Sequence, residues 1–427
     1  MTASEDRKRS LFGFAAVTSL FFAWGFITSN NDPLIVALRA AFSLDYSEAL
    51  LTQIVFFLAY GLLSLPAAWL SSRLGSVDVI LGSLGLMACG CVAVVLSTSA
   101  RSFWPILAAL FVLAAGFTAL QVAANPLAAE LGPARGRHFR LNFAQAFNSL
   151  GVVLGVHFGS AIMLGDPVLR SGGVELGAGR RDELLGAVNH AFLIMASLLS
   201  LMLLMFVAMR GSLISVTSNH RRSPSRMFAA AGSRWAVFGA IAIGLYVGAE
   251  VSIGSIMINF LNQPHVLALP LEVAGGYLAN FYWGGALAGR LVGTALLTRI
   301  SASWLLSACG IVAALLCATV LASSGPIGGY AALAVGFFNS IMFPTIFSIT
   351  LERSGVSQSS TSGLLCVAIF GGALLPMAVG VIADRFGLGI SFAIPLIAYL
   401  YIAAFALAAG GRIFASPEPA TSASPIP

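Results

Sequence analysis

Three consecutive polar residues interrupt the first apolar stretch of the chain. The stretch WGFITSNNDPLIVALR contains Asn30, Asn31 and Asp32, and Pro33 follows at once. If this stretch crosses a bilayer, a carboxylate near its centre costs at least about 2.5 kcal/mol on insertion scales, so the acid is a candidate functional group. Asp32 could titrate or pair with a cation, and Asn31 could supply a further oxygen.

The proline beside this acid affects the backbone. Pro33 has no N–H, so the carbonyl of Ser29 loses its usual helical partner. We expect the helix to kink or loosen here, and such breaks offer free backbone polar groups to a ligand near the membrane midplane.

Other polar residues recur at helical spacing. Glu250, the second intramembrane acid, lies one turn beyond Tyr246 in LYVGAEVSIGS, so the two share a face. The same rule pairs Gln121 with Asn125, Gln145 with Asn148 and Asn280 with Trp283; Asn339 precedes a break expected at Phe343-Pro344, and Trp24 opens the first stretch. A single amide in a membrane span is about equally often a structural residue that only forms a hydrogen bond between helices.

The composition identifies the elements that would carry these residues. Of the 427 residues, 58% are hydrophobic and 9% are charged, with a mean hydropathy of +0.94; soluble domains carry about 25% charged residues. A spanning helix needs roughly 20 mostly apolar residues. We predict an all-α membrane protein with twelve transmembrane helices at 11–38, 49–71, 77–97, 102–129, 140–164, 185–209, 235–262, 271–297, 303–323, 326–350, 359–383 and 389–410.

A basic stretch divides these helices into two sets of six. It reads RGSLISVTSNHRRSPSRMFAAAGSR and holds five arginines and no acid. We predict an N-terminal six-helix bundle at 1–210, a basic cytoplasmic linker at 211–234, a C-terminal six-helix bundle at 235–412 and a disordered tail at 413–427.

Basic residues also predict the orientation, because cytoplasmic loops carry the excess of Lys and Arg. With both termini cytoplasmic, the inner side holds Arg7, Lys8, Arg9, Arg73, Arg135, Arg137, Arg140, the linker arginines, Arg290, Arg299, Arg353 and Arg412. The outer side holds Arg39, Arg101, Arg170, Arg180, Arg181 and Arg385. The net charge of +6 then reflects topology, and we expect no nucleic acid partner.

The polar residues favour a polyhydroxylated ligand. Amides and carboxylates can both donate and accept, and sugar rings stack on Trp and Tyr. Peptides and nucleosides could use the same groups.

The sequence has no GxxxxGK[ST] loop and no metal-ligand spacing among its five histidines. A polytopic enzyme would need a general base or metal cluster near an interface, and a drug exporter would have a mostly apolar pocket; neither pattern is present.

Several stretches together resemble the fucose–galactose–glucose:cation symporter family of the major facilitator superfamily, closer to its glucose/galactose branch. They are WGFITSNNDPLI, QIVFFLAYGLLSLPAAWLSSRLG, LQVAANP with LGPARGRHFRLNFAQAFNSLG, YVGAEVSIGS, FFNSIMFPTIFS and SGLLCVAIFGGALLPMAVGVIADRFG. The resemblance implies two six-helix bundles, alternating access and uptake of a hexose or related sugar with a cation. The alternatives are a superfamily exporter or a carrier of another polar solute.

The resemblance also implies roles for individual residues. Asp32 occupies the place of the helix 1 aspartate, whereas Gln121 replaces the helix 4 glutamate of the fucose-type branch, so a relay through two carboxylates is not expected. Gln145 and Asn148 match sugar-contacting positions. Ser72-Arg73 replaces the usual Asp-Arg pair after helix 2. His157 matches no family motif, and we expect it to be packed and neutral.

We therefore expect Asp32, with Asn31 and Gln121, to link a cation to sugar binding. A proton is the first choice for the coupling ion, and sodium at Asp32 is the alternative, without any other metal or cofactor. The predicted sugar contacts are Gln145, Asn148, Asn125, Trp24, Glu250, Tyr246, Asn280, Trp283 and Asn339. We expect a monomer that is not an enzyme, in a bacterial-type inner membrane.

Overall fold

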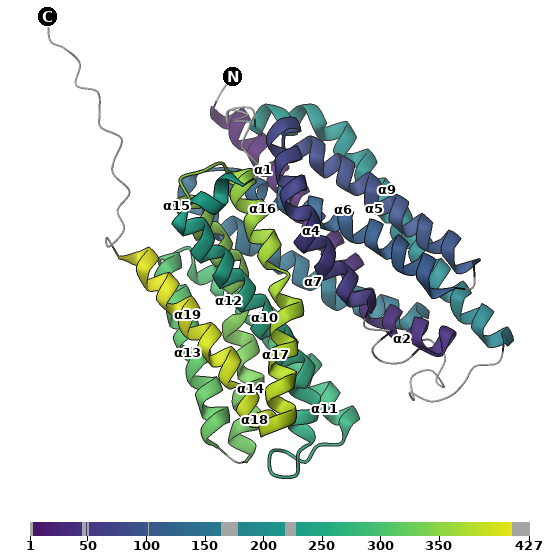
Figure 1. Ribbon diagram of the computed structural model, residues 1–427. Coiled ribbons are helices and arrows are strands. Elements are labelled where there is room, and N and C mark those ends of the chain that lie inside the picture. Colours follow the sequence, from purple (N-terminus) through teal and green to yellow (C-terminus); the bar gives the residue numbers. More distant parts are fainter. Residues whose placement is uncertain are drawn as a thin grey trace, which may run out of the picture.

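The protein is an almost entirely helical bundle in which two groups of helices lie side by side (Figure 1). This computed structural model describes residues 3–44, 48, 51–100, 102–163, 178–217, 228–323 and 325–411. The predicted tail at 413–427 and residues 218–227 of the predicted linker lie outside the described residues, as does the side chain of Asp32.

The first group comprises the helices before the linker. They are α1 (Ala3–Thr28), α2 (Asn31–Phe42), α4 (Leu51–Leu74), α5 (Ser76–Thr98), α6 (Phe103–Glu130), α7 (Arg137–Met163) and α9 (Ala178–Thr217), with a short 3₁₀ turn η1 (Ala134–Gly136). Within this group α5 packs on α4, α6 and α9, and α1 packs on α7.

The second group follows a 3₁₀ turn η2 (Ala229–Gly232). It comprises α10 (Arg234–Asn262), α11 (Leu271–Tyr277), the π-helical turn η3 (Leu278–Trp283), α12 (Gly284–Leu296), α13 (Ala302–Ala322), α14 (Pro326–Asn339), α15 (Met342–Arg353), α16 (Gln358–Ala368), α17 (Gly371–Phe386), α18 (Leu388–Ser391) and α19 (Ala393–Gly410). Here α13 packs on α14 and α19, and α10 packs on α15, α17 and α19.

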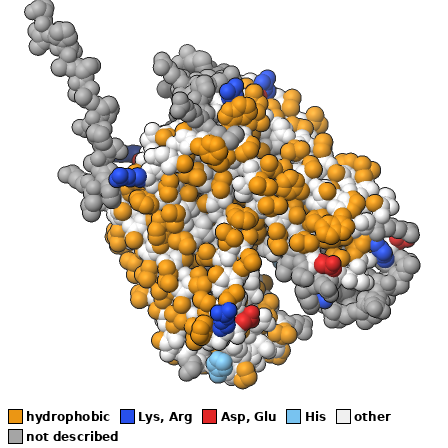
Figure 2. Space-filling view, viewed as in Figure 1, with side chains coloured by type: hydrophobic (Ala, Val, Ile, Leu, Met, Phe, Trp, Pro, Cys, Tyr) orange, Lys and Arg blue, Asp and Glu red, His pale blue; other side chains and the backbone are white. Residues whose placement is uncertain are grey.

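The twelve predicted spans correspond to helical segments of the structure. Eleven of them are long and apolar enough to cross a membrane within the described part of the chain. The remaining span, at 271–297, is interrupted, because η3 separates α11 from α12. Large apolar side chains cover most of the face seen in Figure 2, and most of its charged groups lie toward the ends of the helices. The expected class, a twelve-helix membrane protein, is confirmed.

Both predicted proline breaks occur. The first span is broken between α1 and α2 at Ser29 and Asn30, just before Pro33. In the tenth span, α14 ends at Asn339 and α15 begins at Met342, so the break precedes the expected Phe343-Pro344 position by a few residues. The reason is that proline frees the carbonyl four residues before it, and for Pro344 this is Ser340.

Glycines allow helices α1 and α7 to pack very closely. Gly151, Gly155 and Gly159 recur every fourth residue of α7; the first two face α1, and Gly159 faces Asn30 and Pro33 just beyond its end. A Cβ at Gly151 would overlap the carbonyl oxygen of Phe22, and one at Gly155 would overlap that of Phe26. Small residues at this spacing are typical of closely packed membrane helices. Asn148, on the same helix, donates from Nδ2 to the carbonyl oxygen of Phe21 at 3.0 Å.

The two groups of helices meet mainly at the end of the molecule that carries the first residues of α1 and the last residues of α19 (Figure 1). His138 lies with Nδ1 2.7 Å from the Ser348 hydroxyl and Nε2 3.3 Å from a carboxylate oxygen of Glu352. The Ser362 hydroxyl donates to the carbonyl oxygen of Val122 at 2.7 Å. We call this end the terminal end.

A side-chain hydrogen bond and a close glycine–alanine contact complete the contact at the terminal end. Asn142 on α7 donates to the Thr345 hydroxyl on α15 at 3.2 Å. A Cβ added to Gly363 on α16 would overlap the Cβ of Ala68 on α4. The two groups of helices are therefore locked together at the terminal end, whereas Figure 2 shows a notch between them at the opposite end.

One expectation about packing is wrong. His157 is exposed, and its ring Nδ1 lies 2.8 Å from the carbonyl oxygen of Val153 on its own helix. The side chain therefore points away from the bundle interior, on the face of α7 that does not meet α1.

Candidate functional site

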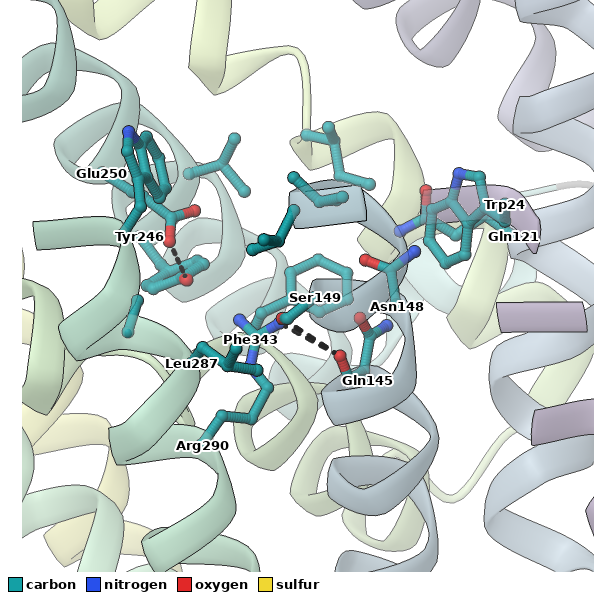
Figure 3. A pocket seen from close by; sticks show the side chains of 16 residues that line it. Trp24, Gln121, Gln145, Asn148, Ser149, Tyr246, Glu250, Leu287, Arg290 and Phe343 are labelled. Atoms are coloured by element: carbon teal, nitrogen blue, oxygen red, sulfur yellow. Dashed lines mark hydrogen bonds between the residues drawn. The ribbon is translucent and has the colours of Figure 1, made fainter. Parts of the chain in front are cut away.

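A cavity of about 260 Å³ lies between the two groups of helices. Its polar and aromatic lining residues are Trp24, Gln121, Gln145, Asn148, Ser149, Tyr246, Glu250, Trp283, Arg290 and Phe343. Figure 3 shows Trp24, Gln121 and Asn148 on one side and Tyr246 and Glu250 on the opposite side. Residues far apart in the sequence therefore form one site.

The first-half wall is rich in amides. Gln121 comes from α6, and Gln145 and Asn148 come from neighbouring turns of α7. Gln145 donates from Nε2 to the side-chain oxygen of Asn125 at 3.4 Å, which fixes the amide from behind. Trp24 of α1 stands beside them, and its indole packs edge-on against Phe21 at 5.5 Å between ring centroids.

The second-half wall carries a carboxylate. Glu250 of α10 is held by Tyr246, whose hydroxyl donates to one carboxylate oxygen at 2.7 Å. Trp283, the last residue of η3, faces the same cavity. The predicted pairing of Tyr246 with Glu250 on one helix face is thus confirmed in geometry.

Arg290 is a charged cavity-lining side chain that the sequence prediction missed. We expected it on the cytoplasmic side, but α12 carries it into the cavity wall. Its Nε donates at 2.9 Å to the carbonyl oxygen of Ser340, the one that Pro344 leaves free. Its Nη1 donates to the Gln145 carbonyl oxygen at 3.2 Å and to the Ser149 hydroxyl. An arginine inside an apolar span is itself a signal of function, and the segment 271–297 contains one.

Arg290 therefore joins the two halves beneath the cavity. The guanidinium offers five N–H donors in a fixed planar arrangement, and in this structure they reach both the helix that carries Gln145 and the broken helix that carries Ser340. A movement that separated α7 from α12 would break these contacts.

Three of the predicted sugar-contacting residues lie outside this cavity. Asn125 is fully buried behind Gln145. Asn339 is also fully buried and donates to the hydroxyls of Tyr282 and Tyr399. Asn280 is exposed and does not accompany Trp283, contrary to the predicted pairing. The π turn explains this result, because residues three apart share a face only at α-helical spacing.

Asn31 lines a different and much smaller cavity. This cavity, of about 10 Å³, also touches Asn30, Phe56 and Phe192. The side-chain oxygen of Asn31 is buried and has no hydrogen-bond partner within the described residues, and the same holds for that of Gln121. The structure thus separates Asn31 from Gln121, and the side chain of Asp32 lies outside the described residues. Their shared role around a cation stays a prediction.

The chemistry of the cavity is that of reversible binding. Gln121, Gln145, Asn148 and Glu250 place donors and acceptors on facing walls, and two indoles flank them. The rest of the cavity lining is apolar and consists of Val152, Val153, Val247, Ala286, Leu287 and Ile369. Such a site suits a small ligand with many hydroxyls and an apolar ring face.

Comparison with known proteins agrees with this arrangement. The chain is 38% identical to a glucose/galactose transporter of Brucella abortus over 410 residues, which cover 95% of this chain and 96% of the relative. It is 31% identical to the L-fucose-proton symporter of Escherichia coli, over 88% of this chain and 87% of that one.

Solved structures give the same result. The structure of the Escherichia coli fucose:proton symporter superposes with a TM-score of 0.79 at 26% identity and covers 94% of this chain and 99% of its own. A second structure, described as the outward conformation, also gives a TM-score of 0.79, at 25% identity and with the same coverage. The sequence profile named Major Facilitator Superfamily matches residues 12–365. The chain therefore belongs to the Major Facilitator Superfamily.

Proposed function

We propose that this protein is a secondary active transporter that carries a hexose or a related sugar into the cell together with a cation. The observation that carries the proposal is the cavity between the two halves, which is lined by amides, a carboxylate and two indoles. Relatives named glucose/galactose transporter and L-fucose-proton symporter, which align over most of this chain, support the same substrate class.

A sugar fits the two walls because each offers one part of what a sugar ring needs. The amides of Gln145 and Asn148 can donate to and accept from ring hydroxyls, and Glu250 accepts from the opposite side. The indole of Trp24 or Trp283 offers an apolar face to ring C–H groups. A cavity of an apolar drug exporter would not need this density of amides.

Transport follows from alternating access. The two halves are locked at the terminal end, so we infer that the ligand enters from the opposite end and leaves after the halves rock apart at the terminal end. Basic residues support a cytoplasmic terminal end, because Arg73, Arg135, Arg299 and Arg353 all lie at helix ends on that side. In this orientation the structure faces outward, across a bacterial-type inner membrane. A single chain forms the whole cavity, which supports a monomer as the working unit.

We further propose that Asp32 links the cation to the sugar. A charge left unpaired in a closed bundle is costly, so a proton or sodium ion at Asp32 would favour closure, and sugar binding would favour the ion by the same factor. A proton is our first choice because one carboxyl suffices for it. Sodium is the alternative because Asn31 offers an unpaired oxygen next in sequence.

The test is binding by the purified, full-length protein. Thermal unfolding would be followed with D-glucose, D-galactose, L-fucose and a non-sugar control such as an apolar cation, because a ligand that binds only the folded state raises its stability. Each series is repeated in sodium and in potassium at several pH values. We expect at least one sugar to stabilise the protein in an ion-dependent manner. Stabilisation by the apolar cation alone would contradict the proposal.

A further inference from the structure

A fully buried polar cluster lies behind the second-half wall of the cavity. It consists of Tyr282 of η3, Asn339 at the end of α14 and Tyr399 of α19, each with 0% of its surface exposed. Asn339 donates from Nδ2 to the Tyr282 hydroxyl at 3.1 Å and to the Tyr399 hydroxyl at 3.4 Å. Polar groups buried inside a bundle are costly unless they are paired, so their pairing specifies how these three helices meet.

The cluster is connected to the cavity through Tyr282. The Tyr282 hydroxyl accepts from Asn339 and donates to the backbone carbonyl of Glu250 at 3.3 Å. A tyrosine hydroxyl has one donor and two acceptor positions, so the two bonds are compatible. Through this contact, the buried cluster holds the turn of α10 that presents the Glu250 carboxylate.

Tyr282 also precedes Trp283, which lines the cavity. The two rings pack edge-on, at 5.0 Å between centroids and 82° between planes. The Trp283 indole lies against Gly254 of α10: a Cβ added to Gly254 would be 3.3 Å from Cζ2 of the indole. On the other side, Gly336 of α14 comes so close to Tyr282 that an added Cβ would overlap the Tyr282 carbonyl oxygen.

The π turn explains why such fixing is needed. A π turn is wider than an α turn and is rare in proteins, where it commonly occurs at functional sites. Here it turns Tyr282 into the bundle interior and its neighbour Trp283 toward the cavity. The bond from the Tyr282 hydroxyl to the Glu250 carbonyl links the turn that carries the indole to the helix that carries the carboxylate.

We propose that Tyr282 and Asn339 are positioning residues for the sugar, which act through Trp283 and Glu250 without touching the ligand. This inference rests on the proposed function, because it assigns the aromatic and carboxylate contacts of the second half to one buried support. It differs from a purely structural role in that the hydroxyl of Tyr282 is required for affinity and not only for stability.

The variant Tyr282→Phe tests the proposal, because it removes one hydroxyl and keeps the ring. A typical hydrogen bond contributes about 0.5–1.5 kcal/mol, so we expect D-galactose or D-glucose to bind about 2- to 12-fold more weakly in calorimetric titrations. The control is Tyr401→Phe, because the Tyr401 hydroxyl likewise donates to a backbone carbonyl of α10, that of Phe238, at 3.3 Å, away from the cavity. Its affinity should stay unchanged.

A double-mutant cycle separates positioning from stability. In a background that carries both Trp283→Ala and Glu250→Ala, Tyr282→Phe should change sugar affinity less than twofold, because both groups that it positions are absent. Equal losses in both backgrounds, or no loss in the native background, would overturn the proposal. Asn339→Leu offers a second route to the same loss if Tyr282→Phe folds poorly. Failure of the proposed function itself looks different, since the unmodified protein would then bind none of the sugars.

Discussion

Arg290 shows how a charged residue is accommodated inside this bundle. Its guanidinium meets the Ser340 carbonyl that Pro344 leaves free, and it reaches the Gln145 carbonyl and the Ser149 hydroxyl on the facing half. The arginine thus satisfies a polar group that the proline would otherwise orphan, while the broken helix helps to offset the cost of burying the charge. It also fixes the backbone of Gln145, whose amide faces the cavity.

We predict that Gln145→Ala and Asn148→Ala each weaken sugar binding by about 1–3 kcal/mol, the usual cost of leaving a buried polar partner unsatisfied. Titration of the folded variants with D-glucose or D-galactose measures the change. Asn262→Ala is the control, because Asn262 also makes an amide hydrogen bond but is exposed and remote from the cavity. Unchanged affinity in both α7 variants would show that these amides serve only in helix packing.

Asp32→Asn should abolish uphill sugar accumulation and leave binding or downhill exchange measurable. Asparagine keeps the shape and one oxygen of the side chain but cannot titrate or neutralise a cation, so it imitates a permanently loaded carrier. Glu250→Gln is the comparison, and we expect it to impair affinity more than coupling, because Glu250 lines the cavity beside Tyr246. Counterflow and gradient-driven uptake in proteoliposomes separate the two effects. If the Asp32→Asn variant still concentrates sugar, Asp32 is not the coupling site and Glu250 becomes the better candidate for it.

At the scale of elements, the glycines of α7 decide how closely it approaches α1. We predict that Gly155→Ala destabilises the protein by about 1–3 kcal/mol, since the added methyl would overlap the Phe26 carbonyl oxygen and the Ser29 hydroxyl. Gly82→Ala in α5 is the matched control, because nothing lies within 4 Å of its added Cβ. It should stabilise the helix by about 0.5–1 kcal/mol. Thermal unfolding in detergent measures both, and equal stability of the two variants would contradict the packing argument.

The sequence predicted the positions of the helices better than it predicted which side of each helix lines the cavity. Long apolar runs and prolines determine where helices begin and break, so the twelve spans and both breaks could be predicted. Spacing also placed Gln145 and Asn148 together, because α7 is a regular helix there. Spacing failed for Asn280, because the chain forms a π turn there. The charge rule failed for Arg290, because a count of basic residues does not distinguish a cytoplasmic loop from a cavity wall. Which face meets which depends on contacts between distant segments.

At the scale of the whole molecule, the contacts at the terminal end hold the two halves in one state. Glu352→Gln should weaken the contact with His138 and shift the population toward opening at this end. Spin labels on cysteines at Leu74 and Val356, in a background without the native cysteines, should report longer distances. Asp78→Asn is the control, because it removes an ion pair with Arg210 within one half. An unchanged distance distribution in Glu352→Gln would show that this pair does not hold the closed end.

The orientation in the membrane can be tested by labelling. Single cysteines in intact cells should react with an impermeant reagent in the loop at 172–179 and stay protected in the linker near Ser218, because twelve spans and a basic linker predict cytoplasmic termini. Cysteine substitution at Ser99, in the short turn after α5, gives a second outer position. Labelling of the linker but not of the loop would reverse the orientation.

The close contact of Gly363 with Ala68 has a consequence for the ion gradient across the membrane. A carrier that is open at one end must stay closed to ions at the other end, since every ion that leaks is lost from the membrane gradient. At this contact the Gly363 backbone packs against the Ala68 methyl group, with no room for a methyl group on Gly363 itself. We expect a bulkier residue at Gly363 to force the two halves apart at the terminal end and so to open a slow ion leak. Its cost would appear as poor growth even in cells that never meet the sugar.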